Sequence, residues 1–410
     1  MFAAAGPCSW SDLPIDILIL ILERLELPHA LAFASVCTTW GSAATAAGVP
    51  RSRAPWIMSW GNNLDKMLLT QDERCSSSDV KCCNLYHPVE NTPDKIYSVS
   101  FPKGCFAACC GASHGWLILA NRLSNLVLYN PVTSAKIHLP PVADFTCVSA
   151  IYDNSGNLKH YRWLGSLYEP ICLGRWFYQK AVLSRSPSKG GHDYIVMIIH
   201  QESEWLSFVK AGQNKWQVAS TLSGSGDRYL DCAHHKGSFY AVTLQGMVEK
   251  WDILDGPKRE LIVSARPHPG CILTRHLVST PWGDLLQVRV VLAVYNSDGI
   301  AFQICKIDPD GLKKVVQENV LMDHALFLGL NHSACLPTKN LPGIRPHCIY
   351  FSAPVITHAF DWLLQLRVWG GVRTYDLETG KFELSFPSCD DHKGLFYGCL
   401  PSEVWITQNL

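Results

Sequence analysis

The segment with the clearest catalytic potential is Gly111-Ala-Ser113-His-Gly115, which fits the pattern G-x-S-x-G. In hydrolases that use this pattern, the serine sits on a sharp turn between a strand and a helix, and the turn exposes its hydroxyl group as a nucleophile. Here the residues from Trp116 to Ala120 predict a strand, then a turn and a second strand, so the helix is missing. We therefore expect Gly111 and Gly115 to be turn residues between strands, and Ser113 not to be catalytic.

Cysteines and a histidine form the densest group of potential metal ligands. The chain has 17 cysteines, and this group consists of Cys75, Cys82, Cys83, His87, Cys105, Cys109 and Cys110. Zinc sites favour paired ligands at short repeated spacings such as C-x2-C, and adjacent cysteines on a strand point in different directions. We expect buried, reduced thiols in the cytosol or the nucleus, and neither a metal site nor a cofactor.

Three further patterns carry less information. Gly224-Ser-Gly226 lacks the third glycine and the helix of a phosphate-binding loop. His234-His235 has no companions at metal-ligand spacing. Asn331-His-Ser333 has the form of a glycosylation site, which only a secreted protein would use.

Composition excludes some classes of partner. The 410 residues include 35 basic and 35 acidic side chains, and 48% of all residues are hydrophobic. This balance gives no electrostatic footprint for nucleic acid or for an anionic membrane. The apolar content is high enough for a small module followed by one large domain.

The most apolar stretch near the N-terminal end of the sequence runs from Leu13 to Ala47. Its residues Ile17 to Leu22 are six consecutive aliphatic side chains. Pro14 and Asp16 suit the first turn of a helix, so we expect a helix from Pro14 to Leu25. A second helix should begin at Pro28 and cover His29 to Val36, and a third should run from Thr38 or Thr39 to Ala47 with Trp40 as its anchor.

A helix that is apolar on all sides must be covered on all sides. Fewer than 50 residues cannot enclose so much apolar surface, so part of this helix predicts a partner. Two other interpretations are a core helix of a larger domain and a targeting segment. The run is too short to span a bilayer and has no basic flank on its N-terminal side.

The order of Leu13-Pro14, the aliphatic helix, Leu25, Leu31, Val36-Cys37 and Trp40 resembles an F-box, the motif that binds the Skp adaptor of cullin-based ubiquitin ligases. The resemblance implies that adaptor-binding residues come from these helices. The candidates are Leu13, Pro14, Ile17, Leu18, Ile21, Leu22, Leu25, Leu31, Val36, Cys37 and Trp40.

Beyond residue 85, pairs of short apolar segments recur. Each pair begins near a glycine or an aspartate, turns, and ends at a polar residue that is expected to cap the turn. The ends of four such pairs are Asn130, Asp252, Asp308 and Asp376, and a weaker pair turns near Lys210. Strand-rich units that repeat every 40 to 70 residues or so predict a β-propeller of roughly six to eight blades, with a large sandwich as the competing fold.

This region resembles the C-terminal domain of a large plant F-box family, a domain of unknown function treated as a kelch-like β-propeller. The similar segments are GWLILA with LYNPVT, the run Leu328 to Ser333, the segment Pro342 to Phe351, and Trp405-Ile-Thr. We therefore predict an α+β multidomain protein. Residues 9–50 form a small all-α F-box module, residues 51–84 a linker with a short helix around Trp56 and Trp60, and residues 85–407 an all-β kelch-like propeller.

The resemblance implies a non-catalytic substrate-recognition subunit. The F-box would bind a Skp-family adaptor and through it a cullin, and the propeller would bind a target protein. The alternative is a non-ligase protein that sequesters its partner, because His29 and Gly41 depart from the usual F-box pattern. A third hypothesis is a hydrolase that uses Ser113. The aromatic cluster Arg175-Trp-Phe-Tyr178 is either an anchor on the propeller rim or part of a blade core.

Overall fold

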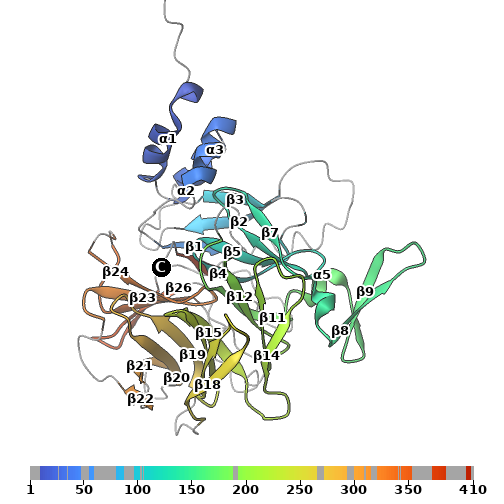
Figure 1. Ribbon diagram of the computed structural model, residues 1–410. Helices are drawn as coiled ribbons and strands as arrows, with labels where there is room; N and C mark the ends of the chain where they lie inside the picture. Colours follow the sequence, from blue (N-terminus) through green and yellow to red (C-terminus); the bar gives the residue numbers. More distant parts are fainter. Residues whose placement is uncertain are drawn as a thin grey trace, which may run out of the picture.

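Three short helices precede a ring of β-sheets in the computed structural model (Figure 1). The structure describes residues 10–25, 27–34, 36–47, 55–59, 80–86, 97–101, 104, 106–187, 193–265, 272–292, 300–308, 311–314, 321–339, 341, 343–352, 372–384 and 403–407. The N-terminal elements are the 3-10 helix η1 (Trp10–Asp12) and the helices α1 (Ile15–Leu22), α2 (Leu27–Ala34) and α3 (Thr38–Ala47).

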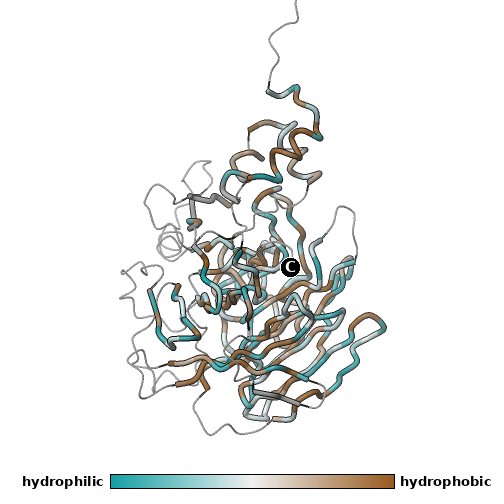
Figure 2. Tube along the Cα trace, turned by 90° about the vertical axis from the view of Figure 1, so that its left-hand side faces the viewer, coloured by the Kyte–Doolittle hydropathy of each residue, from teal (hydrophilic) through white to brown (hydrophobic). Residues whose placement is uncertain are grey.

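The three predicted helices are confirmed, with α1 shorter than expected. Pro14 has an extended ψ of 142°, so it caps α1 and its carbonyl accepts the amides of Ile17 and Leu18. At the other end the backbone NH of Glu23 bonds to Ile19, and the helix stops before Leu25. Figure 2 shows the hydrophobic stretches along these helices.

Six sheets within the described residues form the blades of a propeller. Blade 1 contains β28 (Glu403–Ile406), β1 (Trp56–Ser59), β2 (Val80–Tyr86) and β3 (Tyr97–Phe101). Blade 2 contains β4 (Ala108–Ser113), β5 (Trp116–Ala120), β6 (Leu126–Tyr129) and β7 (Lys136–His138). Blade 3 contains β11 (Tyr178–Leu183), β12 (Ile195–His200), β13 (Trp205–Lys210) and β14 (Gln217–Thr221).

The other three blades follow in chain order. Blade 4 contains β15 (Tyr229–His235), β16 (Ser238–Thr243), β17 (Val248–Asp252) and β18 (Lys258–Val263). Blade 5 contains β19 (Ile272–Ser279), β20 (Leu285–Leu292), β21 (Ile300–Asp308) and β22 (Gly311–Lys314). Blade 6 contains β24 (Ala334–Pro337), β23 (His324–Leu328), β25 (Cys348–Ser352), β26 (Val372–Asp376) and β27 (Phe382–Leu384).

Blade 1 is built from both ends of the propeller. The C-terminal strand β28 pairs antiparallel with β1, so that Trp405 lies opposite Ile57. Trp405 is fully buried, and its indole NH donates to the carbonyl of Leu328 at 3.1 Å. This pairing closes the ring.

The expected linker is therefore partly wrong. Trp56 lies in β1 and not in a short helix, while Trp60 lies outside the described residues. Trp56, Ile57 and Met58 are all buried, because both faces of β1 are covered: Trp56 and Met58 pack in one core cluster and Ile57 packs in another. Strands of the propeller thus begin before residue 85.

Apolar side chains fill the spaces between neighbouring blades. Between blades 3 and 4, for example, Met197 and Phe208 pack in one cluster with Cys232 and Phe239. The cluster between blades 1 and 2 also includes Leu18 and Leu22 of α1 and Ala43 and Ala44 of α3. The helices are thus anchored on the propeller through a shared core.

A smaller sheet projects from the ring after blade 2, and it carries β8 and β9 in Figure 1. Its strands, called the β8–β10 arm below, are β8 (Val148–Tyr152), β9 (Leu158–Trp163) and β10 (Ser166–Tyr168). The flanking elements are the 3-10 helix η3 (Val142–Asp144) and the short helix α5 (Pro170–Leu173). None of the helices in the described ranges is both long enough and apolar enough to cross a membrane.

Candidate functional site

The first helix presents an apolar surface that the rest of the chain leaves uncovered. Ile17 and Leu20 are 43% and 51% exposed. Ile17 and Leu20 are three residues apart, so they are neighbours on one face of α1. Exposed aliphatic side chains grouped on one helix indicate an interaction site.

The opposite face of α1 holds the helices together. Leu18 and Leu22 are fully buried and share a cluster with Ala43 and Ala44 of α3. The unbroken aliphatic run therefore divides into a structural face and an exposed face.

Trp40 anchors α3, as expected. Its ring lies 4.4 Å from the ring of Phe33 in α2. Its indole NH donates to the carbonyl of Trp10 at 3.1 Å, which ties η1 to α3. Because these contacts are internal, Trp40 acts first as a packing residue.

The predicted adaptor-binding residues divide by exposure. The exposed ones are Pro14, Ile17 and Val36. The partly buried ones are Leu13, Ile21, Leu25, Cys37 and Trp40. Leu18 and Leu22 are buried, and the side chain of Leu31 lies outside the described part of the structure. Ile15 and Leu20 are exposed but were not predicted, although the helical spacing of Leu20 from Ile17 was a usable signal.

Gly41 has a packing explanation. A Cβ atom at this position would lie 3.2 Å from the carbonyl oxygen of Ala34. Glycine therefore lets α3 approach the end of α2 closely, so this departure from the usual pattern fits a folded three-helix module.

Ser113 does not occupy a nucleophile elbow. It ends β4, and the two residues after it turn into β5 without a helix. Its side chain is buried, and its hydroxyl oxygen accepts the backbone NH of Leu183 at 3.2 Å. This bond links blade 2 to blade 3, which is a structural role.

The two glycines of this motif have different roles. Gly115 is in the turn with φ of 74°, as expected. Gly111 lies within β4 and is therefore not a turn residue. A Cβ atom at this position would collide with the backbone carbonyl of Ala181 in β11. Glycine at 111 thus allows the two strands to approach.

The cysteine group does not form a metal site in the described residues. Cys83, Cys109 and Cys110 are buried free thiols, and burial raises the pKa of Cys109 to about 12. Groups of three or more potential ligands are absent from the part of the chain that the structure describes. Cys75, His87 and Cys105 lie outside it, as does the side chain of Cys82.

Three of the four polar residues predicted to cap turns at strand ends do so, and the two residues after the fourth, Asp308, lie outside the described part of the chain. The side chain of Asn130 accepts the backbone NH groups of Val132 and Thr133 at 2.9 and 3.1 Å. Asp252 accepts the NH of Leu254, and Asp376 accepts those of the two residues that begin its turn.

The remaining sequence patterns are also structural. Gly224 and Gly226 have φ of 79° and 72° and form a turn. Asn331 is buried, and its amide donates to the carbonyl of His332 at 2.8 Å. It is therefore part of the fold and is not displayed at the surface.

A buried ion pair, absent from the sequence analysis, joins the inner strands of three blades. Lys180 of β11 contacts Asp231 of β15 at 2.5 Å, and Asp231 accepts the backbone NH of Leu277 in β19 at 2.8 Å. Lys180 also donates to the carbonyl of Gly329 at 3.2 Å. Burial raises the pKa of Asp231, while the Lys180 ammonium opposes that shift.

Buried histidines surround the same region. His276 lies 3.8 Å from Asp231, and burial, with a smaller contribution from Lys180, lowers its pKa to about 3. His332 is buried against the backbone NH of His234, and burial lowers the pKa of His234 to about 4. His276 and His234 are therefore neutral at pH 7. The charges in this buried region are those of Lys180 and Asp231, which compensate each other.

The aromatic cluster at 175–178 belongs to the core. Phe177 and Tyr178 are buried, and the Tyr178 hydroxyl donates to the carbonyl of Ser124 at 2.9 Å. Trp176 is partly buried, with its ring 4.8 Å from that of Trp163. The core alternative is correct for Phe177 and Tyr178, but residues 175–177 lie in the turn before β11, so the cluster does not form a strand with alternate aromatic residues facing inward.

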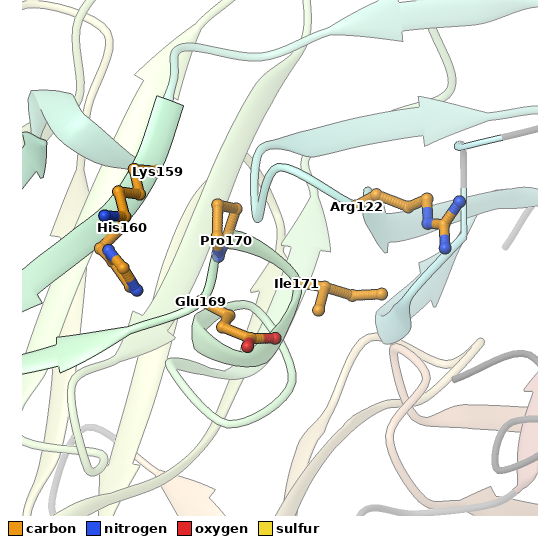
Figure 3. A pocket seen from close by; sticks show the side chains of 6 residues that line it. All are labelled: Arg122, Lys159, His160, Glu169, Pro170 and Ile171. Atoms are coloured by element: carbon orange, nitrogen blue, oxygen red, sulfur yellow. The ribbon is translucent and has the colours of Figure 1, made fainter. Parts of the chain in front are cut away.

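A pocket of about 430 Å³ lies beside this cluster, at the base of the β8–β10 arm. Its lining residues are Arg122, Lys159, His160, Glu169, Pro170 and Ile171. Figure 3 shows Lys159 and His160 on one side of Glu169 and Pro170, and Arg122 on the other. The pocket is a second candidate for binding.

Comparison with known proteins matches both parts of the chain. Residues 10–48 match the F-box domain, and residues 85–381 match the KIB1-4 β-propeller. Three F-box proteins of Arabidopsis thaliana are similar over almost their whole length. One is 31% identical, covering 93% of this chain and 96% of the relative. Two others are 26% and 24% identical, covering 92% and 90% of the relatives.

Proposed function

Because the chain belongs to the F-box proteins that carry a KIB1-4 β-propeller, we propose that it is the substrate-recognition subunit of a Skp-cullin-F-box ubiquitin ligase. The F-box would bind a Skp-family adaptor and through it a cullin, and the propeller would bind a target protein. The chain would perform no bond chemistry itself. It would raise the effective concentration of target lysines near the charged ubiquitin-conjugating enzyme.

The observation that carries the proposal is the uncovered apolar face of α1. Ile17 and Leu20 are about half exposed, although a folded chain with a large propeller had ample surface to cover them. Fully burying an aliphatic side chain is worth about 1.5 to 3 kcal/mol, so covering the exposed half of each gains about 1 kcal/mol gross. A partner that buries both side chains therefore gains about 2 kcal/mol gross from them.

The structure also defines which substitutions test this proposal cleanly. Leu22 is fully buried, so a charge there would unfold the helical module and say nothing about the interface. Ile17→Asp with Leu20→Asp changes exposed positions only. A matched control is Leu254→Asp with Leu261→Asp, because these leucines are 69% and 50% exposed in blade 4.

The experiment is co-expression of the chain with a Skp-family adaptor and a cullin, followed by size-exclusion chromatography. We expect the wild type and the control variant to elute with both proteins, and the α1 variant to elute alone. Addition of the activating and conjugating enzymes should then produce ubiquitin chains only with the first two. Failure of the folded wild type to elute with the adaptor would favour the sequestering alternative.

A further inference from the structure

The β8–β10 arm is not needed to close the propeller. Blades 2 and 3 touch each other directly, because Gly111 of β4 lies against Ala181 of β11 and Ser113 bonds to Leu183. The arm is inserted between these blades, and its strands pair only with each other among the described residues. Its presence therefore calls for a role other than ring formation.

The base of the arm is held firmly. Tyr161 of β9 donates its hydroxyl hydrogen to the carbonyl of Leu123 at 2.8 Å. The Trp163 ring lies 4.8 Å from that of Trp176, and Tyr168 lies 5.2 Å from Trp176. A surface fixed in this way loses little conformational entropy when it binds a partner.

The turn between β9 and β10 displays an apolar residue. Leu164 and Gly165 form the turn between β9 and β10 with φ of 45° and 84°. Asparagine and glycine suit this conformation, whereas a bulky side chain is strained in it. Leu164 is nevertheless 71% exposed, so it gains little from packing. The turn therefore holds an aliphatic side chain out in solvent, where a partner can cover it.

The outer face of the arm extends this apolar surface. Leu167 is 55% exposed and pairs across the sheet with the exposed Arg162. Aliphatic side chains beside an arginine make a surface suited to a protein partner.

The pocket adds a charge preference. Arg122 and Lys159 line it with one carboxylate, Glu169, and neither cation forms an ion pair within 4.0 Å in the described structure. The two cations and the one carboxylate leave the lining with one net positive charge. Such a lining suits a single carboxylate better than a doubly charged phosphate.

We propose that the β8–β10 arm and the adjoining pocket form the docking surface for an extended segment of the target protein. The segment carries an aspartate or glutamate for Arg122 and Lys159, next to a large apolar side chain for Leu164 and Leu167. This inference rests on the proposed function, because it assigns the target to one side of the propeller. A nucleic acid partner is disfavoured by the chain's equal numbers of basic and acidic residues.

The test begins with phage-displayed random dodecapeptides selected on the purified full chain. We expect the selected peptides to contain an acidic residue within a few positions of Leu, Ile or Phe. Binding of the best peptide, labelled with fluorescein, is then measured by fluorescence anisotropy. Two variants should each weaken it at least tenfold: Leu164→Ser with Leu167→Ser, and Arg122→Glu with Lys159→Glu.

Matched controls come from exposed positions elsewhere. Leu254→Ser with Leu261→Ser and Lys215→Glu with Lys258→Glu should bind the peptide as the wild type does. A selection that enriches no peptide, peptides without an acidic preference, or arm variants with unchanged affinity would overturn the proposal. So would tighter binding of a single-stranded RNA dodecamer through the same residues.

Adaptor binding separates this inference from the proposed function. The arm variants should still elute with the Skp-family adaptor, because α1 is unchanged in them. A chain that binds the selected peptide but no adaptor would contradict the ligase assignment alone. A chain that binds the adaptor but loses no peptide affinity in the arm variants would contradict the docking surface alone.

Discussion

The ion pair between Lys180 and Asp231 gives a sharp test of how the blades are held together. Lys180→Met leaves the buried carboxylate of Asp231 with the backbone NH groups of Cys232 and Leu277 as its remaining strong donors. Asp231→Asn leaves the buried ammonium with the carbonyl of Gly329. Breaking a buried pair from one side costs about 3 to 5 kcal/mol of folding free energy, because it leaves an uncompensated charge.

The double variant Lys180→Met/Asp231→Asn should lose much less than the sum of the single variants. It contains no buried charge, and the asparagine oxygen still accepts one backbone NH. We expect the double variant to lose about 3 kcal/mol, whereas the two single losses sum to about 6 to 10 kcal/mol, which is a coupling energy of at least about 3 kcal/mol. The assay is urea denaturation at pH 7, with tryptophan fluorescence as the readout.

The pH dependence of Lys180→Met provides an independent readout. Without the ammonium, only the two backbone hydrogen bonds oppose the effect of burial on Asp231, so its folded-state pKa is raised further above its unfolded value of about 3.9. A carboxyl group with a raised pKa binds its proton more tightly in the folded state than in the unfolded state. The unfolding free energy that Lys180→Met loses relative to wild type should therefore shrink as the pH falls from 7 to 5. Additive losses within about 0.5 kcal/mol would refute the reasoning.

Two further predictions concern stability. The pKa of His200 and His276 is lowered to about 3 and that of His234 to about 4 by burial, so they stay neutral in the folded chain and take up protons on unfolding below pH 6.5. Together they should lower the unfolding free energy by about 3 to 4 kcal/mol between pH 6 and pH 5, and equal urea midpoints at both values would contradict this. Trp405→Ala should cost about 3 to 5 kcal/mol by opening the ring closure. The exposed Trp10→Ala should change the melting temperature little, and similar losses for both would show that β28 does not close the ring.

Local features of the sequence predicted the elements well. The three helices follow from proline, threonine and an aliphatic run, and strand pairs such as β16 and β17 follow from apolar segments around a glycine turn. The α+β multidomain architecture is confirmed. These elements depend on neighbouring residues, which sequence patterns report directly.

Contacts between distant residues were not predictable in this way. The pairing of Trp56 with Ile406 joins the two ends of the propeller, and the short strand β1 looked like part of a linker. Lys180 and Asp231 stand in different strands, so nothing local shows that they meet. A single charge within an apolar strand, such as Lys180 in YQKAVL, is the available signal.

The exposed face of α1 was only partly predictable, for a different reason. Six consecutive aliphatic residues have no polar positions to mark the outward side. Leu18 and Leu22 pack inward because α3 lies against them, which leaves Ile17 and Leu20 outside. Only the packed structure separates residues that hold the module together from those available to a partner.

Titration of the chain with a Skp-family adaptor by isothermal calorimetry tests the central claim most directly. We predict one-to-one binding with a negative heat-capacity change, as expected for apolar burial. Ile17→Asp/Leu20→Asp should weaken binding by roughly a thousandfold, since each charge costs about 2 kcal/mol in an apolar interface. Leu254→Asp/Leu261→Asp should bind as the wild type does. Equal affinity for the α1 variant and the wild type would contradict the account.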